Sequence, residues 1–208
     1  MLARDNERLI EVGDLDRADL DLRDRHVTAL KTTMNWVERF LCRPHPDLGR
    51  PGAVCPWTQP SLNRRLLWQA VIEGDIEEAE VVESSLRRYR DWFLDLDPTD
   101  PFARRFKTIL VLFPDIDASR ADELIDAVQL RLKPSFVSEG MMVGQFHAAC
   151  PEPGLRNPAF RPLRSPVPML AMRFMVETDK PFLEHSPELL ATWTRLFGVR
   201  ASGCPVAH

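Results

Sequence analysis

Histidine and cysteine side chains gather in two segments of this chain that are rich in proline and glycine. The first, CRPHPDLGRPGAVCPWTQPS, covers residues 42–61, and the second lies within EGMMVGQFHAACPEPGLRNPAFRPLRSPVPML, residues 139–170. Imidazole and thiol groups bind metal ions and haem iron, and they act as bases or nucleophiles. The candidate residues of the two segments are Cys42, His45, Cys55, Trp57, His147 and Cys150.

His147 is a candidate for the single axial ligand of a haem iron. It follows an apolar run that contains Met141, Met142, Val143 and Phe146. One nitrogen donor among soft apolar side chains is the combination that a haem pocket needs. The alternative interpretation is a histidine that hydrogen-bonds to the backbone beside a methionine-rich core strand.

The same residue types allow other sites. A zinc site would tolerate the short spacings Cys42-x2-His45 and His147-x2-Cys150. A nucleophilic thiol is a further interpretation, with Cys55 or Cys150 activated by His147 or His45. Thiols that pack as small apolar groups are the alternative to both. His45 is also the alternative ligand for haem iron.

Arg161, Arg164 and Arg173 form a second group of candidates, in the motifs FRPLRSP and AMRFM. An unpaired buried charge is costly, so Arg173 must contact an acid, a carbonyl or an anionic ligand. Two interpretations stay open. One is a salt bridge to Asp179 or Glu177, and the other is a clamp on a substrate carboxylate or a haem propionate.

Proline makes residues 151–168 an irregular loop, because each proline fixes φ and removes an N–H donor. A loop of this length is usually either functional or disordered. Apolar residues such as Phe160, Leu163 and Met169 favour order. We therefore expect residues 42–61 and 151–168, named here the first and second Pro/Gly segments, to wall a pocket.

Composition limits the partners. The chain has 208 residues, a net charge of −4 and 28% charged residues, which fits a soluble domain and excludes a general surface for nucleic acid. It has no apolar run long enough to span a membrane and no apparent signal peptide, so a cytoplasmic protein is expected. A small-molecule substrate is the expected partner, and a homodimer stays open.

Apolar periodicity predicts helices over residues 24–41, 76–96, 187–197 and from a cap at Asp117 or Ser119 to a stop or kink at Pro134. Strands are predicted over residues 66–72, 106–113, 141–146 and 169–175. This order predicts an α/β or α+β fold, with a small mixed sheet flanked by helices. Residues 1–22 are expected to be a poorly ordered tail, residues 23–208 a single globular domain, and residues 201–208 its frayed end.

Five motifs carry a resemblance to a known family. PHPDLGRPGAVCPW, FKTILVLFPDI, GMMVGQFH, GLRNPAFRPLRSPVPMLAMRFM and DKPFL resemble bacterial proteins with a domain of unknown function, DUF6875, over roughly residues 44–183. Such proteins are often found beside natural-product biosynthetic genes. The resemblance therefore implies a role in secondary metabolism, although the family label gives no activity.

A second resemblance is to YqcI/YcgG-like proteins, which include haem-dependent oxygenases that hydroxylate guanidine or amine nitrogens of amino-acid-like substrates. It rests on the order of Cys55-Pro56-Trp57, the strand Phe106 to Pro114, a helix and a late apolar strand pair. It implies a haem held by His147, a pocket lined by Cys55 and Trp57, and an arginine on a propionate or substrate carboxylate. The histidine-rich strand end of that group is absent at Arg173–Thr178.

The expected function is therefore a haem-binding oxidative enzyme, an N-oxygenase of an amino-acid-like molecule. The residues expected around the cofactor are His147, Cys55, Trp57, Arg161, Arg164 and Arg173. A non-catalytic protein that binds a small molecule or a partner, and a zinc-stabilised fold that uses Cys42, His45, His147 and Cys150, are the alternatives.

Overall fold

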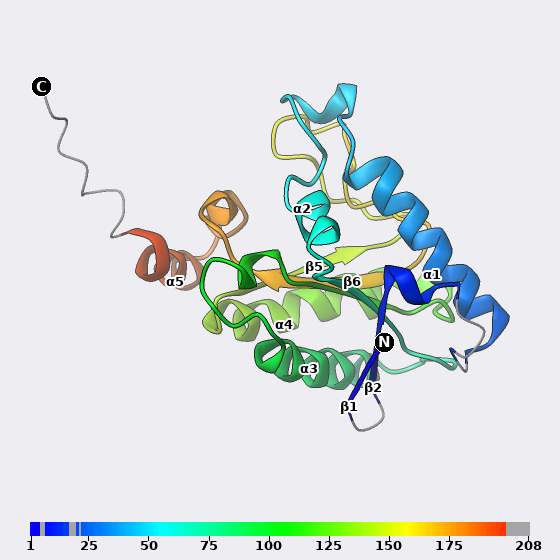
Figure 1. Ribbon diagram of the computed structural model, residues 1–208. Coiled ribbons are helices and arrows are strands. Elements are labelled where there is room, and N and C mark those ends of the chain that lie inside the picture. The colour runs from blue at the N-terminus through cyan, green and yellow to red at the C-terminus, as the bar shows by residue number, and fades with distance from the viewer. Residues whose placement is uncertain (5–6, 17–19, 21, 199–208) are drawn as a thin grey trace, which may run out of the picture.

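The computed structural model describes residues 1–4, 7–16, 20 and 22–198, and its centre is a six-stranded mixed sheet (Figure 1). The strands are β1 (Leu2–Arg4), β2 (Glu7–Glu11), β3 (Leu67–Val71), β4 (Thr108–Leu112), β5 (Met141–Phe146) and β6 (Met169–Phe174), in the spatial order β1-β2-β3-β4-β6-β5. The α-helices are α1 (Asp24–Trp36), α2 (Thr58–Asn63), α3 (Ala79–Asp95), α4 (Ala127–Ser138) and α5 (Pro187–Phe197).

Strands β3, β4 and β5 run in the same direction. β3 pairs in parallel with β4, and β6 pairs antiparallel with both β4 and β5. Strands that run in the same direction need a crossover connection. Helix α3 makes the crossover from β3 to β4, and α4 makes the one from β4 to β5. The C-terminal ends of these three strands therefore lie along one edge of the sheet, here called the carboxyl edge.

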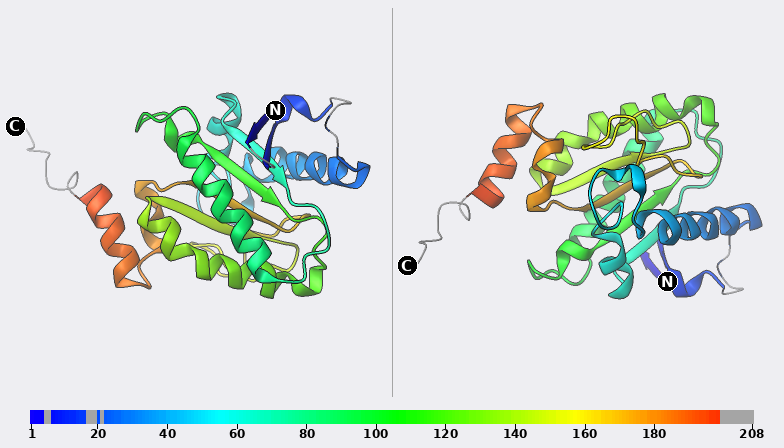
Figure 2. Two further views of the ribbon diagram at one scale, coloured as in Figure 1. Left: turned by 90° about the horizontal axis from the view of Figure 1, so that it is seen from below. Right: turned by 90° about the horizontal axis from the view of Figure 1, so that it is seen from above.

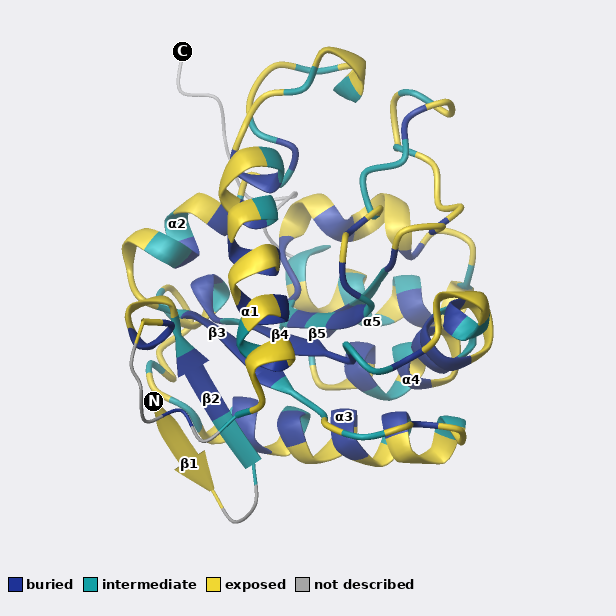
Figure 3. Ribbon diagram, turned by 90° about the vertical axis from the view of Figure 1, so that its right-hand side faces the viewer, coloured by how far each residue is buried: buried dark blue, intermediate teal, exposed yellow. Residues whose placement is uncertain are grey.

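Two layers cover the sheet. Helices α3 and α4 lie on one face, whereas α1, α2 and the two Pro/Gly segments lie on the other (Figures 1 and 2). Because side chains alternate along a strand, Ile109 and Val111 of β4 pack toward α3 and α4, and Leu110 and Leu112 pack toward α1. The central strands β3 and β4 are almost wholly buried, while β1 is exposed (Figure 3).

The predicted α/β class and the four predicted strands are confirmed. The predicted helices also form, with small shifts at their ends. Helix α4 continues through Pro134. Because proline has no N–H, the carbonyl of Leu130 loses its hydrogen bond within the helix. Leu130 is 64% exposed, so water can provide the missing hydrogen bond. Helix α1 passes into a π-helical turn, Val37–Leu41, before Cys42.

The N-terminal residues differ from the tail that the sequence predicts, because their described part adds two strands to the sheet. β2 pairs antiparallel with β3 through Ile10 and Gln69, and Leu9 and Ile10 are both buried. Leu9 and Ile10 stand among charged residues, so the sequence indicates a strand here only weakly. Their burial depends on the pairing of β2 with β3. The frayed end expected over residues 201–208 lies outside the described residues. No helix in the described part is long and apolar enough to cross a membrane.

Lys107 is a fully buried cation just before β4. Its Nζ donates hydrogen bonds to the carbonyls of Phe93 (2.8 Å) and Leu96 (2.5 Å), which end helix α3. Burial, assisted by the charge of Arg104, lowers the pKa of Lys107 to about 8. The unfolded chain binds this proton up to pH 10.5, the ordinary value. Between pH 8 and 10.5 the unfolded state therefore holds more protons, and this residue favours folding more as pH rises.

We expect the Lys107→Met variant to reveal this dependence. The stability of the wild type relative to the variant should rise by up to about 3 kcal/mol between pH 7.5 and pH 10.5, because about 2.5 pKa units separate the two states. Cys42, Cys150 and Tyr89 also have raised pKa values, but their effects cancel in this difference. Urea unfolding of both proteins across this range measures it. A difference that stays constant or falls would contradict the assignment.

Candidate functional site at the carboxyl edge

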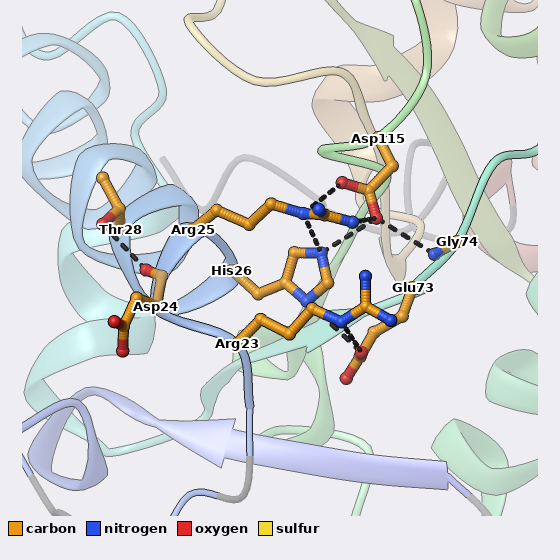
Figure 4. A network of polar contacts seen from close by, with 8 residues as sticks. All are labelled: Arg23, Asp24, Arg25, His26, Thr28, Glu73, Gly74 and Asp115. Atoms are coloured by element: carbon orange, nitrogen blue, oxygen red, sulfur yellow. Dashed lines mark hydrogen bonds and ion pairs between the residues drawn. The ribbon is translucent and has the colours of Figure 1, made fainter.

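Polar side chains gather at the carboxyl edge, where three strand ends meet. Glu73 follows β3, Asp115 follows β4 and His147 follows β5. The first turn of α1 brings Arg25 and His26 to the first two of these positions (Figure 4). In open α/β sheets, ligands bind outside the carboxyl ends of the strands. A ligand-binding site is therefore expected at this edge.

His26 is fully buried between two carboxylates. Its Nε2 lies 2.9 Å from Oδ2 of Asp115, and its Nδ1 lies 3.4 Å from Oε2 of Glu73. Asp115 also accepts hydrogen bonds from the backbone N–H of Gly74 (3.0 Å) and from Nη2 of Arg25 (3.1 Å), and Nε of Arg25 lies 2.9 Å from its Oδ1. The network joins the start of α1 to the loops after β3 and β4 (Figure 4).

These contacts keep Asp115 ionised. Burial opposes its ionisation, but the hydrogen bonds from Gly74, Arg25 and His26 and the charge of His26 outweigh burial and lower the pKa of this carboxyl group. A carboxylate with a lowered pKa is a weak general base at neutral pH. It is instead a fixed negative charge that can bind a cationic group.

A hollow of about 280 Å³ opens beside this network, and we call it the Arg25–Asp115 hollow. Its polar lining residues are Arg25, Thr28, Thr32 and Asp115, and its apolar ones are Ala29, Pro114, Pro166, Val167 and Pro168. Three residues at the end of the second Pro/Gly segment thus line this hollow. Their partner there is helix α1, whereas the first Pro/Gly segment does not reach this hollow.

A second polar group lies at the end of β5. The ligand atoms of Asp126, His147 and Cys150 are all within 4.8 Å of one another, and this is the only group of three potential metal ligands among the described residues. Nε2 of His147 is 3.0 Å from Oδ1 of Asp126. Of the zinc ligands predicted from the sequence, His147 and Cys150 belong to this group. Cys42 and His45 do not, because the chain places them in the first Pro/Gly segment on the α1 side of the sheet.

The surroundings of Cys150, one of the two predicted cysteine nucleophiles, give no support to that role. Burial, with smaller contributions from the charges of Asp126 and Glu152, raises the pKa of Cys150 to about 11. Burial and the nearby Cys55 similarly raise the pKa of Cys42 to about 11. A nucleophilic cysteine needs the opposite shift, toward a thiolate at neutral pH. The thiols of Cys42 and Cys150 are therefore protonated unless a cation binds them.

The two Pro/Gly segments contact each other on the α1 side of the sheet. The ring of His45 stacks on Phe160 with centroids 4.6 Å apart, and Nδ2 of Asn157 donates a hydrogen bond to the carbonyl of Asp47 (2.9 Å). Gly49 has φ = 73°, and a Cβ at this position would lie 2.9 Å from a side-chain atom of Arg156. Glycine is therefore required for the close approach of the two segments, and the pocket that they were expected to wall stays a prediction.

The three predicted arginines are occupied by protein groups. Arg173 makes a two-bond ion pair with Asp179, at 2.7 and 2.5 Å, which is one of the two partners that the sequence suggests. Burial would lower the pKa of Arg173, but the hydrogen bonds and charge of Asp179 raise it. Arg161 donates to the carbonyls of Pro158 and Phe160, and Arg164 lies 3.5 Å from the carbonyl of Cys150.

The six residues expected around a haem make their contacts in different parts of the fold. His147 contacts Asp126 near the start of α4, whereas Cys55 packs with the cluster beneath α1. Trp57 packs on Phe106, with ring centroids 5.9 Å apart, and the arginines are engaged as described. His45 accepts a hydrogen bond at Nδ1 from the N–H of Asp47, which leaves the proton of a neutral ring on Nε2. These contacts do not fit a haem, and its binding stays a prediction.

Several residues of the carboxyl edge escaped the sequence analysis. Asp115 and Glu73 lie within three residues of the ends of two predicted strands. An acidic residue just after a buried strand could therefore have indicated a polar site at this edge. The sequence did not indicate a role for His26, because its partner Asp115 is 89 residues away in sequence. Asp126 lies in a helical segment, where a charged residue is normally exposed.

The fold and these contacts define an α/β protein with a six-stranded mixed sheet and two polar clusters at its carboxyl edge. The chain belongs to the family described as a domain of unknown function, DUF6875, whose profile matches residues 30–204. The family resemblance predicted from the five motifs is therefore confirmed. No curated protein and no solved structure matches the chain.

Proposed function

We propose that the protein binds a small zwitterionic molecule, similar to an amino acid, in the Arg25–Asp115 hollow. The observation that carries this proposal is the charged pair of Arg25 and Asp115 in the lining of a hollow at the carboxyl edge. Buried His26 and the N–H of Gly74 both contact Oδ2 of Asp115 and hold this carboxylate in position. A charge held in place before the ligand arrives lowers the entropic cost of binding.

The polar wall offers one group for each charge of such a ligand. Arg25 is 56% exposed in its side chain, and within the described part of the chain its Nη1 makes no hydrogen bond, so it can donate to a ligand carboxylate. Asp115 can accept from a ligand ammonium group through Oδ1, which among the described residues contacts only Nε of Arg25. A zwitterion can pair with both Nη1 of Arg25 and Oδ1 of Asp115, whereas a ligand with one charge can pair with only one of these atoms.

Size and polarity limit the rest of the ligand. Ligand pockets typically measure about 300–1,000 Å³, and a hollow of about 280 Å³ is slightly smaller than this range. Pro166, Val167 and Pro168 form a rigid apolar wall that suits an aliphatic or aromatic side chain. The hollow therefore favours a single amino-acid-like unit over a peptide or a nucleotide.

We expect some zwitterionic amino acids to raise the melting temperature of the protein. At a ligand concentration 100 times the dissociation constant, the gain is about 2.7 kcal/mol. Analogues of the same side chain without the carboxylate, or without the amine, should bind at least about 10-fold more weakly, because one charged bond is lost. Thermal unfolding across a panel of amino acids, followed by calorimetric titration, measures both effects.

Thr32→Trp is the variant that separates binding from folding, because Thr32 is exposed and lines the hollow without touching His26. The indole should fill the hollow and abolish binding while leaving stability nearly unchanged. Lys31→Trp is the matched control, one residue along the same helix and outside the hollow. Equal binding by wild type and Thr32→Trp would refute the proposed site. An absorption spectrum after expression with a haem precursor tests the haem expectation separately.

A further inference from the structure

We infer that Asp126, His147 and Cys150 form a site for a single divalent transition metal ion, with Zn²⁺ the best match. All three ligand atoms lie within 4.8 Å of one another. The site is distinct from the Arg25–Asp115 hollow, whose lining contains none of these residues. It does not depend on the function proposed for that hollow.

The fold holds two of the ligands rigidly. His147 directly follows β5, and its carbonyl accepts hydrogen bonds from the N–H groups of Cys150 (3.1 Å) and Ser165 (3.3 Å). The tight turn from 147 to 150 brings the thiol back beside the imidazole. Asp126 comes from the last residue of the helical turn that precedes α4, which packs against β5. Three separate backbone positions therefore converge without a flexible connection.

Burial is the second observation that indicates a bound ion. Cys150 is fully buried and His147 is 3% exposed. The Nδ1 atom of His147 is buried and has no hydrogen-bond partner in the described part of the chain, although its Nε2 contacts Asp126. Buried ring nitrogens normally have a partner. This unpaired nitrogen is not the proposed ligand atom, because the ion would bind Nε2 beside Asp126 and leave the ring proton on Nδ1.

The donor atoms select the metal. Nitrogen, oxygen and sulfur together suit zinc and similar ions, whereas Mg²⁺ and Ca²⁺ require oxygen ligands. A thiolate and a carboxylate carry two negative charges, which balance a divalent cation in a buried position. Three protein ligands leave a fourth position for water.

Binding requires only a small rearrangement of the group. Zinc bonds of about 2.0–2.3 Å place tetrahedral ligand atoms about 3.5 Å apart. The nitrogen of His147 and the oxygen of Asp126 are 3.0 Å apart and must separate slightly, whereas the longest separation in the group, at most 4.8 Å, must shorten. The ion would take the place of the proton between these two atoms, which would move to Nδ1 of the ring, and the thiol would lose its proton to solvent as it binds. Side-chain rotations of about 1 Å complete the geometry.

The test uses the untagged full chain, stripped with a chelator and titrated with Zn²⁺ or with Co²⁺ as a spectroscopic probe. We expect one equivalent of zinc by elemental analysis, a higher melting temperature, and a thiolate-to-cobalt charge-transfer band. Wild-type protein that shows no such band, or binds no zinc, would overturn the inference without any variant. An unfolded variant therefore cannot leave the question open.

Matched variants then locate the site. Cys150→Ala and His147→Gln should weaken zinc binding by more than about 100-fold, since each removes a direct ligand. Asp126→Asn should weaken it by a smaller factor. Cys42→Ser and His45→Gln, two residues of the zinc set predicted from the sequence, should bind like the wild type. Loss of the cobalt band in Cys42→Ser, or its survival in Cys150→Ala, would refute the assignment.

Discussion

Replacing Asp115 by alanine is expected to lower the free energy of unfolding by about 3 kcal/mol at neutral pH. The carboxylate is 12% exposed and accepts hydrogen bonds from His26, Arg25 and the N–H of Gly74. Its removal takes the carboxylate away from fully buried His26, whose Nε2 keeps, among the described residues, only the contact with Nε of Arg25 (3.2 Å), and breaks the link between α1 and the loop after β4. Urea unfolding of both proteins measures the loss.

The pH dependence of this loss identifies its cause. The pKa of Asp115 is below its ordinary value of 3.8 in the folded state, so its contribution is fully present above that value and disappears as pH falls through the folded pKa. The difference between wild type and Asp115→Ala should therefore shrink in acid.

Asp16→Ala is the control, because Asp16 is 93% exposed and its ion pair with Lys31 lies in solvent. It should change stability by less than about 0.5 kcal/mol. If Asp115→Ala were equally mild, the network would not hold α1 to the sheet.

Replacing Asp179 by alanine is the second change with a large expected effect, about 3–4 kcal/mol. Asp179 is 2% exposed, accepts both hydrogen bonds from Arg173 and also accepts one from the N–H of Val176 (2.8 Å). Its loss leaves a guanidinium group, 22% exposed, without a counter-charge in the β6 strand. It also removes the acceptor that begins the 3-10 helix Glu177–Phe182.

A double-mutant cycle separates the ion pair from general damage. Arg173→Met together with Asp179→Ala should cost at least about 1.5 kcal/mol less than the sum of the single changes, because the second change removes the unpaired charge. Chemical unfolding of the four proteins gives this coupling energy. Strictly additive losses would show that the two residues do not act as a pair. Glu184→Ala, which removes an exposed contact with Lys180, should be nearly neutral.

Local sequence patterns were sufficient for most of the secondary structure. The run FKTILVLF has no polar alternation after Thr108, and a strand buried on both faces requires such a run, so β4 was predictable as a central strand. Ser186-Pro187 likewise predicted the start of α5, where the Ser186 hydroxyl accepts from the N–H of Leu189. These features depend on neighbours within a few residues. β2 was not predictable, because its burial depends on pairing with β3 about 60 residues later.

The sequence by itself determined the α/β class, the family, the loop character of the Pro/Gly segments and the candidate status of His147, Cys150 and Arg173. Only the tertiary structure decided the partners of these side chains. Topology places His147 on the α4 side with Asp126, and Cys55 and His45 on the α1 side, so no sequence spacing could assign them to one site. There are two physical reasons. Side chains that are close in sequence can point to opposite faces of the sheet, because they alternate along a strand. Long crossover connections bring residues that are distant in sequence, such as His26 and Asp115, to the same end of the sheet.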